Sequence, residues 1–130
     1  MMSVTHSTAA RNAATDAVTA LIGASGNLKF RLAGTVAAPG AAVATLPLSA
    51  TGFGASATGT ATANAITSDT NAAGNATAVA TATLETSAGV VVIHCAVAAS
   101  ASDINMTNGL IIAAGDTVTC SSLTYTALSA

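Results

Sequence analysis

The sequence predicts a mainly β protein: an antiparallel β-sandwich or jelly-roll-like barrel with one short N-terminal α-helix. Several runs of residues alternate between apolar and polar side chains, which is the period of a half-buried strand. Turn-forming residues separate these runs at spacings of about 8 to 15 residues, as in small all-β domains. The 130 residues fit a single domain over 1–130, with the helix over 7–22 and the β-sandwich over 27–128.

The helical pattern lies near the start of the chain. Five apolar residues recur at helical spacing and share one face: Ala10, Ala14, Ala17, Val18 and Leu21. Ser7 or Thr8 is the expected N-cap, and Gly23 is the expected stop signal. Because most of this face is alanine, we expect it to approach a neighbouring backbone closely.

Two strands are expected directly after the helix. The run "NLKFRLAG" alternates between two sets of side chains, which are Leu28, Phe30 and Leu32, and Asn27, Lys29 and Arg31. A turn at Pro39-Gly40 precedes a second run, in which Ala42, Ala44, Leu46 and Leu48 share one face. Pro47 has no amide hydrogen to donate, which places this second strand at a sheet edge or at a bulge.

The middle of the chain predicts a β-hairpin. In "ATAVATATLE", residues 76–85, alanines and Leu84 share one face, while threonines, Val79 and Glu85 share the other. We interpret this run as a strand with a thin inner face, because a linker has no reason to keep such alternation. The run "VVVIHCAV" follows the turn "TSAG" and predicts the returning strand. Its expected inward residues are Val91, Ile93, Cys95 and Val97.

The last third of the chain repeats this pattern with shorter runs. Asn108-Gly109 lies between "DINMT" and "LIIAA", and Asn-Gly between two short apolar runs is a strong hairpin signal. The turn "GD" then precedes "TVTCSSLTYTAL", which predicts a final strand region.

The composition limits the classes of function. The chain holds 34 alanines but only 27 Val, Ile, Leu and Phe residues, so its core is thin and a partner or oligomerisation would add stability. Only eight residues are charged, with a net charge of −2, which favours a compact chain over a disordered one. Three cations are too few to neutralise the phosphates of a nucleic acid, and one Tyr without any Trp offers little for stacking on bases. Nucleic acid is therefore not an expected partner.

Membrane insertion and export are not expected either. The longest apolar stretch, residues 88–101, is shorter than the roughly 20 residues that a spanning helix needs, and it fits a buried strand. The start of the chain shows no basic stretch followed by an apolar run, so folding in a cytoplasm is the default expectation. In that reducing compartment Cys95 and Cys120 are expected to be free, buried thiols, although the two could pair.

No residue pattern indicates catalysis, and we expect neither an enzyme nor a cofactor or metal. His94 and Cys95 are neighbours in a predicted strand and point to opposite faces, so they cannot form a dyad. The other histidine, His6, lies near the terminus, so spacing suggests no two-histidine metal site. The loop "DTNAAGN" begins like a calcium loop, but Ala73 and Ala80 stand at two of its ligand positions.

The three cations are the remaining candidate site residues: Arg11, Lys29 and Arg31. Lys29 and Arg31 share one predicted strand face that we expect to be exposed, where charges ordinarily serve solubility. The functional alternative is docking onto an acidic protein surface, because strand-borne cations would fix the register of such a contact more than its affinity.

Three segments together resemble a known group of proteins. They are "STAARNAATDAVTALIGASGNLKFRLAG", "SDTNAAGNATAVATATLETSAGVVVIHCAV" and "LIIAAGDTVTCSSLTYTA". A short Ala-rich helix that leads through glycines into a strand with alternating basic residues is similar to the N-terminus of small Ala/Thr/Gly-rich virion proteins of tailed bacteriophages. The resemblance covers nearly the whole chain and is one of composition more than of specific motifs.

Members of that group are typically head decoration or minor capsid proteins, and some are tail-associated. The resemblance implies a β-rich structural protein of the virion, assembled in the host cytoplasm. It would bind the outside of the capsid as a homo-oligomer on the lattice and stabilise contacts between major capsid proteins. Many copies on one lattice would offset weak individual contacts.

Two other functions remain open. One is a phage tail or fibre-associated protein that contacts the host surface, although the single Tyr125 gives it little to bind sugars with. The other is an extracellular adhesin or surface-layer module, which would need an export signal.

Overall fold

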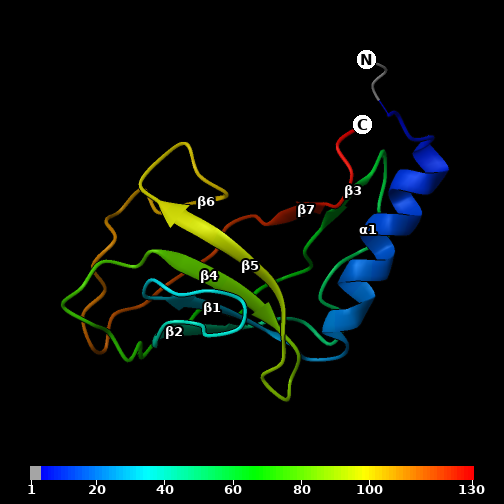
Figure 1. Cartoon of the computed structure of the whole chain (residues 1–130). Coiled ribbons are helices and arrows are strands. Elements are labelled where there is room, and N and C mark those ends of the chain that lie inside the picture. Colours follow the sequence, from blue (N-terminus) through cyan, green and yellow to red (C-terminus); the bar gives the residue numbers. More distant parts are fainter. Residues whose placement is uncertain (1–3) are drawn as a thin grey trace.

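The protein is mainly β with one helix, and most of its strands form one curled, mixed sheet (Figure 1). The structure is a computed structural model that describes residues 4–130, so the first three residues of the predicted domain lie outside the described part. The elements in chain order are α1 (Thr8–Ile22), β1 (Asn27–Arg31), β2 (Ala42–Pro47), β3 (Thr60–Thr62), β4 (Thr81–Glu85), β5 (Val91–Ala98), β6 (Ile104–Asn105) and β7 (Thr124–Thr126). Within this described part, no helix is both long and apolar enough to cross a membrane.

The large sheet has the strand order β2-β1-β4-β5-β6. Neighbours from β2 to β5 are antiparallel, and β6 pairs in parallel with the end of β5. One row of apolar residues is aligned across the four antiparallel strands: Leu46, Leu28, Leu84 and Ile93. This face packs with residues from the long loops, including Val79, Ile112 and Val118, in a single core cluster. The predicted alternation in β1 is therefore confirmed.

The outer edge of β2 is covered by the loop that follows β3. The Thr67 amide donates to the Pro47 carbonyl at 2.9 Å, and the Gly74 amide donates to the Val43 carbonyl at 3.0 Å. Pro47 thus ends an edge strand of the sheet, as the sequence predicts.

The helix begins and ends where the sequence predicts. The Ser7 hydroxyl accepts a hydrogen bond from the Ala10 amide, and Gly23 ends the helix with φ of 70°. Ser7 is therefore the N-cap, and glycine suits the left-handed conformation after the last turn.

The predicted apolar face of the helix is wrong. Three of its members are exposed, namely Ala10, Ala17 and Leu21. The buried helical residues are Thr15 and Ile22. The Thr15 hydroxyl donates to the Gly59 carbonyl at 2.6 Å and accepts from the Ala127 amide at 3.1 Å. The inward face of the helix therefore carries a threonine that bonds to the neighbouring backbone as well as the apolar Ile22.

The strands β3 and β7 form a separate two-stranded ribbon that packs on α1 (Figure 1). Thr60 pairs with Thr126, and Thr62 pairs with Thr124. This ribbon brings the C-terminal strand beside the helix. Because it lies against α1, it does not form the second layer that a sandwich requires, and the predicted sandwich or jelly-roll is not confirmed.

The predicted middle hairpin is confirmed as β4 and β5, with a shorter first strand. Residues 76–80 lie outside any strand, and β4 begins at Thr81. Val79, assigned to the outer face by alternation, is only 2% exposed because the loop turns it into the core. All five residues of β4 are buried, so this central strand is covered on both faces.

Two bulges displace residues from their predicted faces. The register shifts between Leu84 and Glu85 in the β4–β5 ladder, and between Phe30 and Arg31 in the β1–β2 ladder. Val92 therefore packs against the core in place of Val91, and Val43 is buried while Ala42 is exposed. An extra residue in one strand shifts every side chain on one side of it to the other face.

The predicted hairpin at Asn108-Gly109 is wrong. The run before this turn supplies β6, which pairs with β5, and residues 110–114 form no strand. Their carbonyl groups bond to a distant segment instead: Asn75 donates to Ile112 and Val79 donates to Leu110, both at 2.8 Å. These long-range partners replace the local pairing that the turn signal favours.

Replacing Gly26 by alanine is expected to destabilise the fold. A Cβ at this position would collide with the Glu85 carbonyl oxygen and lie 2.5 Å from Ile22 Cγ2. Overpacking of this kind costs about 1–3 kcal/mol. Gly54→Ala is the matched control, because a Cβ there meets only the Thr62 carbonyl oxygen, at 3.8 Å. Chemical denaturation measures both variants, and equal free energies of unfolding would contradict this packing.

Candidate functional site

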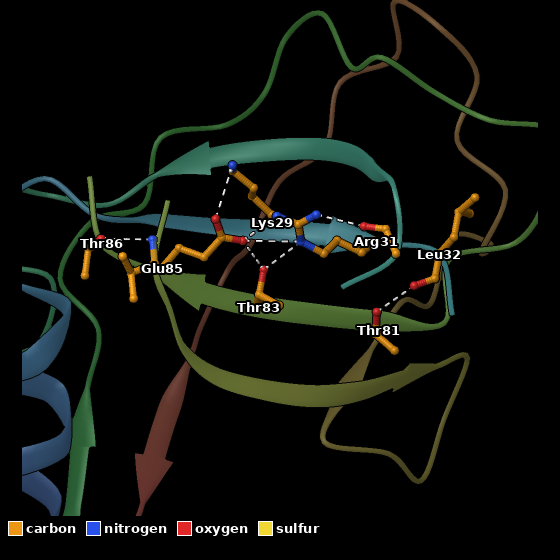
Figure 2. A network of polar contacts seen from close by, with 9 residues as sticks. Lys29, Arg31, Leu32, Thr81, Thr83, Glu85 and Thr86 are labelled. Atoms are coloured by element: carbon orange, nitrogen blue, oxygen red, sulfur yellow. Dashed lines mark hydrogen bonds and ion pairs between the residues drawn. The ribbon is translucent and has the colours of Figure 1, made fainter. Parts of the chain in front are cut away.

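Three charged side chains meet on the face of the sheet opposite the apolar row. Lys29 and Arg31 belong to β1, and Glu85 is the last residue of β4. The two strands are adjacent and antiparallel, and Asn27 pairs with Glu85, so the three side chains share one face. Figure 2 shows the Glu85 carboxylate reaching toward both cations. We call these residues, together with Thr83, the Glu85 network.

The Glu85 network combines two ion pairs with several hydrogen bonds. Lys29 Nζ lies 3.2 Å from Glu85 Oε1, and Arg31 Nη2 donates to Glu85 Oε2 at 2.6 Å. The Thr83 hydroxyl also donates to Oε2 and accepts from Arg31 Nε at 3.0 Å. The Lys29 contact lacks hydrogen-bond geometry, so Oε1 is buried with a counter-ion but without a hydrogen bond.

Arg31 extends the network to the loop between β1 and β2. Its Nη1 donates to the Gly40 carbonyl at 2.7 Å. A Cβ on Gly40 would collide with the carbonyl oxygen of Leu32 and with that of Ala33, so only glycine allows this close approach. The Thr81 hydroxyl holds the same loop by donating to the Leu32 carbonyl at 2.8 Å (Figure 2). The network therefore fixes a loop as well as two strands.

The carboxylate of Glu85 is stabilised in its charged form. Its side chain is 1% exposed, and burial by itself raises the pKa. The hydrogen bonds from Thr83 and Arg31, the nearby Lys29 ammonium and the Arg31 charge lower the pKa by more, so it lies below the ordinary value of 4.5. The site therefore holds an ionised carboxylate whose charge is balanced within the chain.

The structure brings together two of the three predicted docking residues. Lys29 and Arg31 share one face as expected, but their side chains are only 24% and 13% exposed, so that face is not an open one. Arg11 lies elsewhere: its Nε donates to the Leu128 carbonyl at 3.1 Å and its Nη2 to the Thr58 carbonyl at 2.9 Å. All three cations have structural partners, and their docking role stays a prediction.

Glu85 is the residue of this network that was not among the predicted site residues. Its position is the signal: it ends a run of alternating threonines, whereas the other four carboxylates are aspartates in the helix or in loops. A carboxylate in a predicted strand, with two cations at alternate positions of another strand, indicates a cross-strand ion pair.

The remaining charged side chains also bond to the chain itself. Each of the four aspartates accepts a backbone amide hydrogen: Asp16 from Ser56, Asp69 from Thr45 and Asn71, Asp103 from Ala96, and Asp116 from Ala113. With Arg11 and the Glu85 network, all eight charged residues of the sequence therefore have an intramolecular partner. Asp69 serves as a turn former, and the part of the chain that the structure describes contains no cluster of three metal-ligating side chains.

His94 and Cys95 occupy successive register positions on opposite faces of β5, opposite Thr83 and Ala82 respectively. Burial, with a smaller contribution from the Asp103 carboxylate, raises the pKa of the Cys95 thiol to about 11. Cys95 is therefore a thiol, and not a thiolate nucleophile, at neutral pH. Cys120 is also free, and burial raises the pKa of its thiol too.

A hollow of about 610 Å³ lies between Phe30 and the loops of the last third of the chain. Its acidic lining residues are Asp103 and Asp116, and both carboxylates already accept backbone amides. The hollow contains no histidine or lysine beside them.

The chain matches no protein family, and it has no significant match among curated proteins or solved structures.

Replacing Glu85 by glutamine is expected to cost about 3 kcal/mol of folding free energy, because it leaves Lys29 and Arg31 without their counter-ion in a largely buried site. Asp116→Asn is the matched control. Its carboxylate is in an exposed turn, and surface substitutions change stability by about 0.5 kcal/mol or less. Denaturant titration at pH 7 measures both, and equal losses would show that the network contributes no more than a surface turn.

Acid is expected to weaken the wild-type protein more than Glu85→Gln. Because the folded pKa of Glu85 is lowered, the stability from its ionised form is present above the unfolded value, near 4.5. It is lost as the pH falls from there through the lower folded pKa. The stability difference between wild type and Glu85→Gln should therefore shrink below about pH 4.5. A difference that stays constant down to pH 2 would contradict the assignment.

Proposed function

We propose that this protein is a structural virion protein, a head decoration or cement protein that binds the outside of a tailed-phage capsid and stabilises contacts between major capsid proteins. The resemblance of its sequence to such proteins supplies the class. The observation that best supports it is that every charged side chain has an intramolecular partner. Such a surface offers little for catalysis or for electrostatic binding.

A surface of this kind suits contacts made by shape and by backbone hydrogen bonds. The exposed large apolar residues are scattered over α1 and four loops or turns: Val4, Leu21, Val36, Val90 and Ile111. Contacts of small, neutral residues are weak one at a time. Many copies on a lattice would make them strong together, because neighbouring sites raise the effective concentration.

The thin core supports the same proposal. Four of the 16 buried apolar residues in the core are alanines, and each removes little apolar area from water. A partner that binds only the folded protein shifts the folding equilibrium toward the folded state. Binding to a capsid lattice would therefore stabilise both the bound protein and the lattice. The antiparallel sandwich or jelly-roll-like barrel expected from the sequence stays part of this proposal.

The salt dependence of capsid binding tests the proposal. Purified protein is added to capsids that the encoding phage assembles without it, and bound copies and heat resistance are measured. We expect saturable binding and higher heat resistance, with affinity that changes less than about threefold between low and high salt, because exposed charges contribute little.

Absence of binding to these capsids would reject the proposal. A fall in affinity of about tenfold or more with added salt would instead support docking by the cations. Arg11→Gln tests one of these cations by itself, since Arg11 lies outside the Glu85 network. Quantitative mass spectrometry of virions distinguishes a decoration protein from a tail protein by its copy number per particle. A decoration protein is present in hundreds of copies, and a tail protein in only a handful.

A further inference from the structure

The outer edge of β5 is open along most of its length. The strand pairs with β4 over Val91–Ala96, but β6 pairs only with Val97 and Ala98 at its far end. Figure 1 shows β5 as the last long strand of the sheet, with the short β6 beside its tip. Among residues 4–130, no backbone group bonds to this edge between Val92 and Cys95.

The hydrogen-bond pattern shows which backbone groups face outward. The Val97 amide donates to the Ala80 carbonyl, so Cys95 and Ile93 also direct their backbone toward β4 by alternation. His94 and Ala96 direct theirs away from β4. The Ala96 amide accordingly donates to Asp103 Oδ2, at 3.0 Å. The amide and carbonyl of His94 therefore lie at the middle of the open edge.

The two edges of the sheet differ in how far their outward backbone groups are covered. The edge of β2 has Pro47, the Asp69 carboxylate on the Thr45 amide, and two backbone hydrogen bonds from the loop that follows β3. The edge of β5 has none of these between Val92 and Cys95. It also lacks charge, because no Asp, Glu, Lys or Arg occurs between Glu85 and Asp103. Proteins ordinarily protect an exposed edge with charge, proline or a covering loop.

We propose that this edge pairs with the same edge of a second copy, antiparallel and about a two-fold axis near Ile93 and His94. Such an interface is self-complementary, because each copy offers the same backbone donors and acceptors. No Asp, Glu, Lys or Arg lies on the part of the edge that would face the partner across the axis, so no ion of these residue types opposes another. The pairing joins two five-stranded sheets into one and satisfies the backbone of His94.

A strand from a different protein is the less favoured occupant. The open segment itself contains no Asp, Glu, Lys or Arg, so no charge on it selects a charged partner segment. A neutral segment with an identical hydrogen-bond pattern is available in every other copy of the chain. This pairing needs no capsid, so its test is independent of the proposed function.

Two substitutions of one residue test the pairing in the full-length protein. His94→Pro removes the outward amide hydrogen and blocks an incoming strand while keeping the hydrogen bonds to β4. His94→Ala is the matched control, because it removes the same imidazole and keeps the amide. The loss of the ring costs no hydrogen bond, since His94 Nε2 is buried without a partner. Sedimentation equilibrium should show a dimer for wild type and His94→Ala, and about tenfold or weaker association for His94→Pro.

Hydrogen exchange of the wild-type protein provides a second measurement that does not depend on the folding of His94→Pro. The His94 amide should exchange slowly in concentrated solution and rapidly after dilution to monomer. A wild-type protein that stays monomeric to about 1 mM would overturn the pairing. So would a dimer that His94→Pro leaves intact, or protection of the His94 amide that appears only on a capsid or another protein.

Discussion

The burial of the Glu85 carboxylate is the constraint on which most of this structure depends. An isolated carboxylate in a protein interior costs several kcal/mol, so its position requires cations and donors arranged around it. β1 supplies Lys29 and Arg31, and Thr83 supplies a hydroxyl. The alignment of β1 with β4, and the path of the loop over Arg31, follow from meeting that requirement.

The same constraint accounts for the character of the surface. In a chain with eight charged residues, balancing Glu85 internally uses two of the three cations, and Arg11 is used to join α1 to the last residues of the chain. The outside carries mostly small, neutral side chains and backbone, with Asp103 and Asp116 exposed in loops. That is the surface we connect with lattice binding, and the open edge of β5 is its most regular part. A protein built in this way gains specificity from hydrogen-bond register more than from charge.

The local sequence pattern predicted the elements whose contacts are close in sequence. It failed where contacts between distant segments determine the local structure. The alternation in residues 27–32, the Ser7 and Gly23 helix ends, the edge position of Pro47 and the β4–β5 hairpin follow from the sequence. The two bulges do not, because a bulge reflects the fit between ladders and not the propensity of one residue. The Asn108-Gly109 hairpin failed because residues 72–79 compete for the same carbonyl groups.

The candidate site was predictable in part. The alternation of side chains in a strand predicts that Lys29 and Arg31 share one face. Their burial depends on Glu85, which lies about fifty residues further along the sequence and reaches them only because β4 pairs with β1. The most direct test of this network is an NMR titration of the Glu85 side-chain carboxyl in the folded protein. The network predicts a midpoint below 4.5, and a midpoint at or above 4.5 would show that the two cations do not balance this carboxylate.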